Sequence, residues 1–210
     1  MHTVRQDDNG WTHIDWTLDG VTADMIDWHW SNMDKTYNLW HPVQHKAFRW
    51  LVPPTAQRFL GAIHSAPQYR SDGSYKVPKL RFDDIASLKE NCRHLIRYDH
   101  AVLVSCVTLG DEDVPDDGPA QSYRIHQWQS SDNGVVGMSS AISFRGETKE
   151  EALRKGLLWA DHGAAEIEYF AGFLAELYKL WSAVKDPDIN IRHSLKIWRT
   201  DSGFRYSGLQ

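Results

Sequence analysis

The sequence predicts an α+β domain in which a curved antiparallel sheet wraps around one long C-terminal helix and leaves an internal cavity. Apolar and polar residues alternate along several segments in the middle of the chain, which is typical of strands. Near residue 148 the apolar period changes from two to about 3.6, which predicts a helix. This order of elements is the helix-grip arrangement, whose expected binding site is the cavity. A ferredoxin-like α+β sandwich is the alternative, but it gives less reason for so long a helix.

The first elements follow from short local signals. Residues 10–19 alternate as a half-buried strand, and Thr22 is a predicted N-cap for a helix over residues 23–30. Helix cannot continue across residues 40–42, because a residue that precedes proline is pushed towards extended conformations. A new helical turn is expected from His45 to residue 48, before a pair of prolines.

The middle of the chain is predicted to be antiparallel sheet. Residues 67–78 are expected to form a loop, and Asn133-Gly134 predicts a tight hairpin turn. Residues 111–119 are expected to be a solvated acidic loop. The expected strands cover residues 79–85, 94–109 with an interruption near 98–100, 122–130 and 135–144.

A long helix then begins at a capping box formed by Thr148 and Glu151. Lys185 to Asp188 are expected to lie beyond its end, and residues 189–210 are expected to be a short extended tail. The predicted apolar stripe of the long helix consists of Leu153, Leu157, Ala160, Ala164, Ile167, Ala171, Leu174, Tyr178 and Trp181.

Length and composition favour one cytoplasmic domain. The 210 residues fit a single domain, residues 1–210, with a core over about 10–184 and a tail over 185–210. The 23 basic and 28 acidic residues give a net charge of −5, which disfavours a nucleic-acid surface. No apolar run reaches the roughly 18 residues of a membrane span, and the N-terminus lacks the apolar stretch of a signal peptide. Cys92 and Cys106 are too few for a disulfide scaffold, so a reducing compartment is expected.

Histidine and tryptophan are concentrated near the N-terminus. The chain has 11 His and 10 Trp, and residues 11–50 hold six of the tryptophans and four of the histidines. Aromatic walls with titratable ligands suit a pocket for a flat organic molecule. The alternative is a tryptophan-rich core with histidines at the surface.

Two groups of residues have the spacing of metal ligands. His162 and Glu166 stand four residues apart on the predicted long helix, so their side chains leave the same face and can chelate one ion. The alternative is an ordinary surface pair. His41 and His45 flank Pro42 in a second segment, where a rigid turn can present one or both imidazoles. Exposed histidines on a loop packed by Trp and Pro are the alternative there.

Together these segments resemble the 2,4-diacetylphloroglucinol hydrolase family, which includes phloretin hydrolase. The matching motifs are Tyr-x-Leu-Trp-His-Pro-x-x-His at residues 37–45 and His-x-x-x-Glu at 162–166, ahead of Phe-Leu-x-x-Leu-Tyr at 173–178. The resemblance covers roughly residues 20–182. It implies a helix-grip (Bet v 1-like) catalytic domain with Zn²⁺ held by His162, Glu166 and a histidine of the first motif, His45 or alternatively His41.

The chain departs from the family between the two motifs. The family places a Glu in a glycine-containing segment, whereas residues 61–73 contain none. Gln68 stands nearest to the expected place, and a neutral amide is a poorer zinc ligand than a carboxylate. Either His64 or Asp72 substitutes for it, or three ligands hold the metal, or no metal binds.

The resemblance implies hydrolysis of a carbon–carbon bond between an acyl group and a phenolic or polyketide-derived ring. Tyr37, by its place in the motif, and His126, by strand alternation, are the expected catalytic residues, one of which protonates the leaving ring carbon. A structural histidine is the alternative for His126. The expected substrate contacts are His41 and an aromatic wall of Trp28, Trp30 and Trp40. A cyclase, an aldolase-like enzyme or a small-molecule carrier with the same cavity is the alternative function. The sequence leaves a homodimer open.

Overall fold

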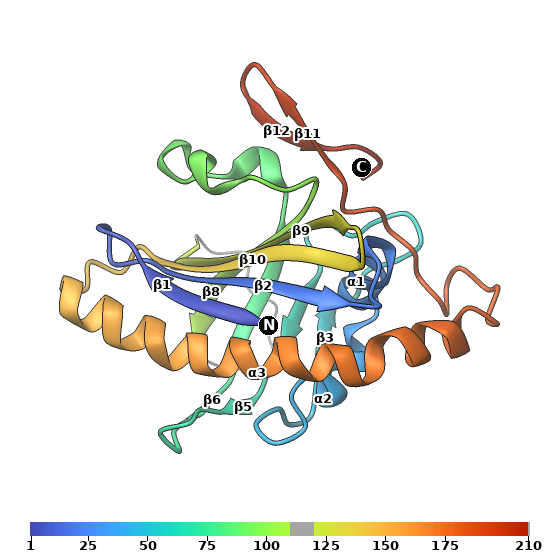
Figure 1. Ribbon diagram of the computed structural model, residues 1–210, viewed down its shortest axis with the longest axis horizontal. Coiled ribbons are helices and arrows are strands. Elements are labelled where there is room, and N and C mark those ends of the chain that lie inside the picture. The colour runs from blue at the N-terminus through green and yellow to red at the C-terminus, as the bar shows by residue number, and fades with distance from the viewer. Residues whose placement is uncertain (110–119, 210) are drawn as a thin grey trace.

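The computed structural model describes residues 1–109 and 120–209 of the chain. In this part, eight antiparallel strands form one curved sheet in the order β1-β2-β10-β9-β8-β7-β4-β3 (Figure 1). The expected acidic loop at 111–119 lies outside the described residues. The bounds of the strands, in sheet order, are His2–Gln6, Thr12–Asp19, Gly134–Ser143, Ser122–Ser131, His100–Leu109, Pro78–Asp83, Ile63–Ser65 and Arg49–Val52.

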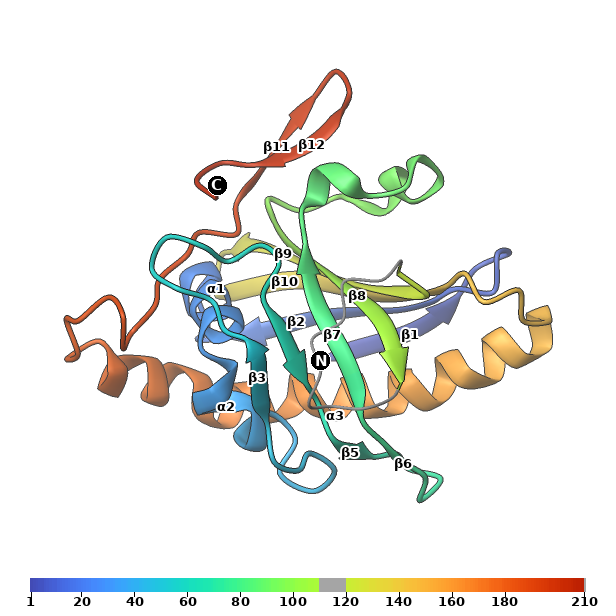
Figure 2. The ribbon, with the colours of Figure 1, turned by 180° about the vertical axis from the view of Figure 1, so that it is seen from behind.

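Helix α3 (Lys149–Trp181) crosses one face of this sheet, as Figures 1 and 2 show from opposite sides. Its predicted capping box is confirmed, because the Glu151 amide donates to Thr148 Oγ1 and the Thr148 amide donates to Glu151 Oε2. The predicted stripe is partly wrong, since Leu157 is 51% exposed and Ala171 also faces solvent. The buried residues of the helix are Gly156, Ala160, His162, Gly163, Ala164, Glu166, Ile167, Phe170 and Leu174.

Two glycines bring α3 close to strand β2. A Cβ built on Gly156 would lie 1.9 Å from Thr12 Oγ1, and one on Gly163 would lie 2.9 Å from Ile14 Cδ1. These contacts allow the helix backbone to approach β2 directly, whereas Leu158, Trp159 and His162 of the same helix line the space between α3 and the other strands. The space for a cavity therefore opens away from β2.

Helices α1 (Ala23–Ser31) and α2 (Met33–Trp40) connect β2 to the far edge of the sheet. The predicted Thr22 N-cap is confirmed, because its side chain accepts from the Met25 amide. The helical turn expected at His45 is wrong. His45 instead forms an isolated antiparallel bridge with Gln68, and strand β3 follows at Arg49.

Other expected elements are corrected by pairings between distant segments. Part of the expected loop over residues 67–78 forms a small hairpin of β5 (Gln68–Tyr69) and β6 (Tyr75–Lys76). The strand expected over 94–109 begins at His100, after the 3₁₀ helices η1 (Ile85–Ser87) and η2 (Glu90–Leu95).

The C-terminal residues form a hairpin on the face of the sheet opposite α3, instead of a lone extended tail (Figure 1). This hairpin consists of β11 (Ile197–Thr200) and β12 (Gly203–Tyr206). Leu195, which precedes it, is fully buried, and its amide donates to Asp27 Oδ2 at 3.1 Å. His100 Nδ1 lies 2.9 Å from the same carboxylate, so α1, β8 and the C-terminal segment meet at one buried group.

The predicted hairpin at Gly134 is confirmed, but the reason for its glycine differs from the expected one. Gly134 does not have a positive φ, and Asn133 does not either. A Cβ on Gly134 would lie 2.0 Å from the Leu18 carbonyl oxygen on the neighbouring strand. The position therefore requires glycine, because the two strands approach each other closely there.

Among the described residues, no helix combines the length and apolar character that a membrane span requires.

Candidate metal centre

A cavity of about 310 Å³ lies between α3 and strands β4, β7, β8, β9 and β10 of the sheet. The rings of three tryptophans and a tyrosine line it together with imidazole, guanidinium and carboxylate groups. Its lining residues include Trp30, Tyr37, Trp40, His45, His64, Gln68, Arg124, His126, Trp159, His162 and Glu166.

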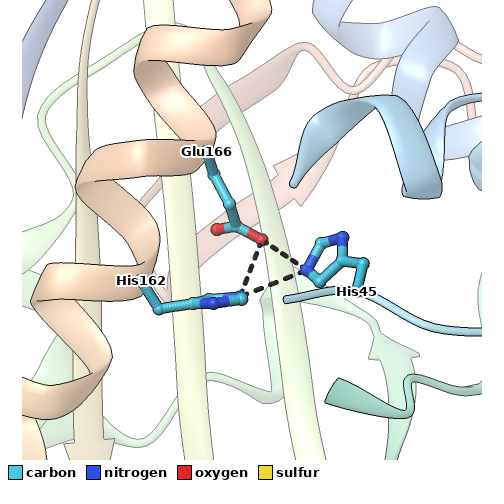
Figure 3. Close-up of side chains that lie close together, drawn as sticks. All are labelled: His45, His162 and Glu166. Carbon is cyan, nitrogen blue, oxygen red and sulfur yellow. Dashed lines mark hydrogen bonds and ion pairs between the residues drawn. The ribbon is translucent and has the colours of Figure 1, made fainter. Parts of the chain in front are cut away.

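His45, His162 and Glu166 meet at one point of this wall (Figure 3). The Nε2 atoms of the two histidines lie 3.2 Å apart, and each lies 3.2 Å from Glu166 Oε1. The three side chains are buried, with total residue exposures of 4%, 4% and 6%. The spacing of four residues on α3 and the bridge that fixes His45 thus place three ligand atoms in an equilateral triangle.

The other nitrogen of each imidazole is held by an acceptor. His45 Nδ1 lies 2.7 Å from the Tyr37 carbonyl oxygen, which can only accept, so the proton of this ring is on Nδ1. His162 Nδ1 lies 2.6 Å from Gln44 Oε1 in the same arrangement. Both Nε2 atoms face the carboxylate oxygen, where each can act as a metal ligand. Partners of this kind fix the tautomer and orientation of histidines that bind metals.

This donor set fits a divalent zinc ion. Zinc with ligands at roughly 2.0–2.1 Å in tetrahedral geometry separates those ligands by about 3.3–3.4 Å. The 3.2 Å edges of the triangle match this separation. Burial alone would raise the pKa of Glu166, but the charges and hydrogen bonds of His162 and His45 outweigh it and hold that pKa well below its usual value. The carboxylate is therefore ionised, and three ligands leave one position open, as in catalytic zinc sites.

Of the two candidate histidines in the first motif, the structure places His45 in the triangle. The His41 ring is stacked on His162, with centroids 4.7 Å apart and planes at 14°. Its Nδ1 accepts from the Gln44 amide, and it does not line the cavity. The expected substrate contact through His41 is therefore wrong, and the residue packs behind a ligand.

The three candidates for the missing family Glu are separated by the structure. Asp72 accepts from the Ser74 amide in the exposed turn between β5 and β6, away from the cavity. Gln68 lines the cavity, and its bridge to His45 puts both side chains on one face of the paired backbone. His64 also lines the cavity, and neither of its ring nitrogens has a hydrogen-bond partner among the described residues.

Tyr37 lies against the triangle. Its ring is stacked on His45, with centroids 3.7 Å apart and planes at 0°. The hydroxyl group donates weakly towards the Pro67 carbonyl at 3.4 Å and Gln68 Oε1 at 3.5 Å. Burial, and then the negative charge of Glu166, raise the pKa of Tyr37 well above its usual value. The phenol therefore keeps its proton at neutral pH.

His126 faces the cavity from strand β9, as expected. Its ring lies 4.9 Å from Trp30 and 6.4 Å from Trp40, and its Nδ1 is 2.9 Å from Ser139 Oγ. Burial lowers the pKa of His126 to about 4, although the charge of Glu166 opposes this shift. The imidazole is thus neutral at physiological pH.

The aromatic wall differs from the expected one at a single position. Trp30 and Trp40 line the cavity, but Trp28 does not. The Trp28 indole donates to Asn190 Oδ1 at 2.6 Å and packs edge-on against Tyr178. Trp28 and Trp30 are two positions apart on a helix, so they point in nearly opposite directions, and the prediction for Trp28 is wrong.

Three cavity or supporting residues were not predicted from the sequence. Gln44 holds His162, while Arg124 and Trp159 line the wall beside the triangle. Strand alternation gives the signal for Arg124, because it is two residues from His126 and shares its face. Gln44 gives no such signal, because its partner is 118 residues away in the sequence.

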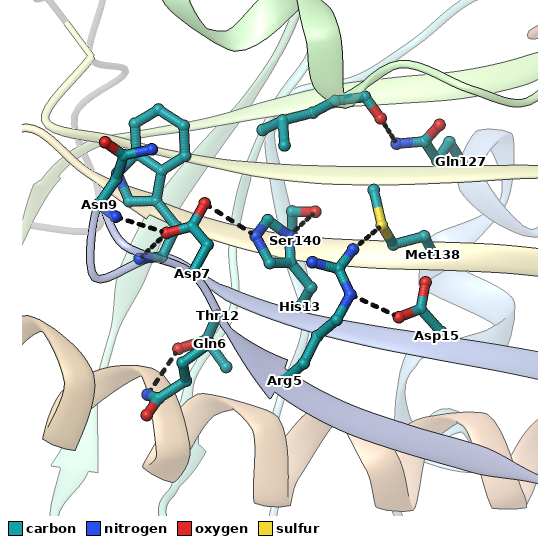
Figure 4. A network of polar contacts seen from close by, with 12 residues as sticks. Arg5, Gln6, Asp7, Asn9, Thr12, His13, Asp15, Gln127, Met138 and Ser140 are labelled. Atoms are coloured by element: carbon teal, nitrogen blue, oxygen red, sulfur yellow. Dashed lines mark hydrogen bonds and ion pairs between the residues drawn. The ribbon is translucent and has the colours of Figure 1, made fainter.

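A second polar cluster lies on the opposite face of the sheet (Figure 4). His13 Nδ1 is 2.8 Å from Ser140 Oγ, and its Nε2 is 3.3 Å from Asp7 Oδ2. Ser140 and His13 are completely buried, and none of the three lines the cavity described above. The polar atoms of these three residues therefore have hydrogen-bond partners within the cluster itself.

Comparisons with known proteins give the fold. No protein-family model matches the chain, and no curated protein matches its sequence. The crystal structure of protein Ms6760 from Mycobacterium smegmatis is similar, with 16% identity, a TM-score of 0.58, and coverage of 83% of this chain and 97% of that one. The structure of ginseng major latex-like protein 151 from Panax ginseng is also similar, with 9% identity, a TM-score of 0.51, and coverage of 77% and 96%.

The fold is helix-grip (Bet v 1-like). A protein from Rhodobacter sphaeroides extends this likeness, with 10% identity, a TM-score of 0.55, and coverage of 84% of this chain and 99% of that one. The predicted fold class is therefore confirmed. At these identities the likeness concerns the fold, and the function has to be argued from the cavity.

Proposed function

We propose that this chain is a zinc-dependent hydrolase that cleaves a carbon–carbon bond between an acyl group and a phenolic or polyketide-derived ring. The observation that carries the proposal is the triangle of His45, His162 and Glu166, whose three ligand atoms converge at 3.2 Å in a buried site. Two imidazoles and a carboxylate at this spacing suit a divalent cation. The open side of the triangle belongs to a cavity with aromatic walls, which suits a flat substrate.

Residues of the cavity would bind the metal and the substrate ring. Zinc bound by such ligands acts as a Lewis acid on a carbonyl group and activates water. Trp30 and Trp40 supply flat apolar surface on which an aromatic ring can pack. Burial of the triangle excludes bulk water, so the charge of Glu166 acts at full strength on groups in the cavity.

Proton transfer completes the reaction. Hydrolysis breaks the bond between the acyl carbon and the ring carbon; the oxygen of water joins the acyl carbon and a proton joins the ring carbon, giving a carboxylic acid and a free phenol. Tyr37 is the proposed proton donor to the ring carbon, because its phenol is protonated and lies against His45. His126, a neutral imidazole that also lines the cavity, is the proposed acceptor of the proton that water releases, and return of this proton to the Tyr37 phenolate restores both groups.

The decisive experiment is the zinc content of the purified protein, measured by mass spectrometry for the wild type, His162→Ala and His41→Ala. About one zinc per chain is expected in the wild type and in His41→Ala, and none in His162→Ala. Turnover of an acyl phenol should follow the metal content. A wild-type protein that takes up no zinc when it is supplied would overturn the proposal.

The second candidate is a cyclase, an aldolase-like enzyme or a small-molecule-binding protein that uses the same cavity without hydrolytic zinc. Gln68 favours it, because an uncharged amide stands beside the triangle where the resembled family has a carboxylate. Ligand binding by metal-free protein, undiminished by Glu166→Gln, would support this candidate.

A further inference from the structure

The cavity wall carries more positive than negative charge. Among its described lining residues, five are basic and two, Glu147 and Glu166, are acidic; the basic residues are Arg70, Lys76, Arg124, Arg145 and Lys155. Glu166 belongs to the triangle. Glu147 is engaged by Lys155 at 2.5 Å and by Ser143 Oγ at 2.9 Å. Four cations therefore remain around one cavity.

Arg124 is the most informative of these cations. In the described part of the chain, no carboxylate lies within ion-pairing distance of its guanidinium, which donates to the Tyr123 carbonyl at 2.9 Å. Burial lowers the pKa of Arg124 to about 10, and the group stays charged at neutral pH. The side chain is partly buried, and such a charge without an ionic partner is costly unless a ligand provides the counter-charge.

Arg124 lies close to the part of α3 that carries the metal ligand His162. Its guanidinium lies 5.4 Å from the centre of the Trp159 ring. Trp159 precedes His162 by three residues on α3, a rise of about 4.5 Å along the helix axis. A flat ring lying along this part of the wall thus reaches the guanidinium at one edge and the triangle at the other.

We propose that the cavity selects an anionic aromatic ligand, an acyl phenol that also carries a carboxylate, and that Arg124 pairs with this carboxylate. This inference rests on the proposed function for the acyl group, whereas the anion site stands on the guanidinium alone. Arginine suits the role because its planar fork binds a carboxylate through two parallel hydrogen bonds. Arg70 and Arg145 contribute attraction at longer range.

The test compares two matched probes, 3-acetyl-2,4,6-trihydroxybenzoate and the corresponding carboxamide. Their dissociation constants are measured by calorimetry with zinc-free wild-type protein, which cannot turn them over by the proposed reaction, and with zinc-free Arg124→Gln, Arg124→Lys and Arg58→Gln. Arg58 is an exposed cation outside the cavity, so its variant controls for net charge. The carboxylate should bind the wild type and Arg58→Gln about 10-fold or more tightly than the amide. The preference should disappear in Arg124→Gln and be reduced in Arg124→Lys.

Equal binding of the two probes to the wild type, or a preference that survives Arg124→Gln, would overturn the inference. Should Arg124→Gln fail to fold, Arg124→Lys replaces it, and a carboxylate preference that is undiminished in that variant counts against the anion site. Glu166→Gln separates this inference from the proposed function. A carboxylate preference retained in Glu166→Gln, with no turnover in any variant, supports the anion site while hydrolysis fails.

Discussion

The Nε2 atoms of His45 and His162 face each other at 3.2 Å, and an acceptor holds the Nδ1 atom of each imidazole. Glu166 is an ionised carboxylate buried beside them, and a buried negative charge is stabilised by a positive charge close to it. The surrounding fold maintains the arrangement through the Tyr37 carbonyl and the Gln44 side chain. The triangle is therefore preorganised for a cation.

Gln44 gives the first prediction. Replacing it by leucine removes the acceptor for the Nδ1 proton of His162, so the ring loses its fixed tautomer. Zinc affinity, measured by competition with a chromophoric chelator, should fall by about 10- to 100-fold. Gln57→Leu alters an exposed glutamine and should bind zinc as the wild type does. Wild-type affinity in Gln44→Leu would show that the hydrogen bond does not orient the ligand.

The close contact between α3 and β2 gives a second prediction. In Gly156→Ala the new Cβ meets Thr12 Oγ1, so the helix has to move away from the strand. We expect the free energy of unfolding in urea to fall by about 1–3 kcal/mol. Gly172→Ala is the matched control on the same helix, because nothing lies within 4 Å of its Cβ. That variant should be more stable by about 0.5–1 kcal/mol, and a similar gain in Gly156→Ala would contradict the proposed contact.

Local signals predicted the elements that depend on neighbours in sequence. The capping box at Thr148 and the hairpin at Gly134 each involve residues fewer than five positions apart. Strands β1 and β4 were not predicted, because they contain only five and three residues, too few to show a clear alternation of apolar and polar side chains. The helical turn expected at His45 was lost to a bridge with Gln68, which is a tertiary contact.

In the candidate site, too, local sequence predicted some features, whereas others depend on tertiary contacts. The pairing of His162 with Glu166 follows from helix geometry alone. The choice between His41 and His45 depends on how the segment after α2 packs, and both lie close to His162. The orientation of Trp28 was equally open, since periodicity identifies a face of a helix without saying what covers it.

His29 gives a prediction on pH. It is completely buried, neither of its ring nitrogens has a partner among the described residues, and burial lowers its pKa from 6.5 to about 3. Below pH 6.5 the unfolded chain binds a proton that the folded chain excludes, so this contribution to stability is present above pH 6.5 and is lost as the pH falls towards 3. The slope from this residue approaches about 1.4 kcal/mol per pH unit.

His29→Leu should therefore flatten the decline of unfolding free energy between pH 6.5 and 4.5, measured by urea titration at several pH values. Other buried histidines keep part of the slope. His94→Gln replaces an exposed imidazole and is the control, for which the wild-type slope is expected. An unchanged slope in His29→Leu would mean that His29 is protonated, or bonded to water, in the folded protein.

Tyr37→Phe tests the proposed proton donor separately from the metal. The phenylalanine ring retains the stacking on His45, and the backbone carbonyl of residue 37 still accepts from His45 Nδ1. Zinc content should therefore remain at the wild-type level, while kcat for acyl-phenol hydrolysis falls by about 100-fold or more. Tyr69→Phe removes the hydroxyl of a tyrosine that is 45% exposed, and full activity is expected. Full turnover in Tyr37→Phe would transfer the proton-donor role to another group, whereas loss of zinc in that variant would show that the hydroxyl helps to hold the metal site together.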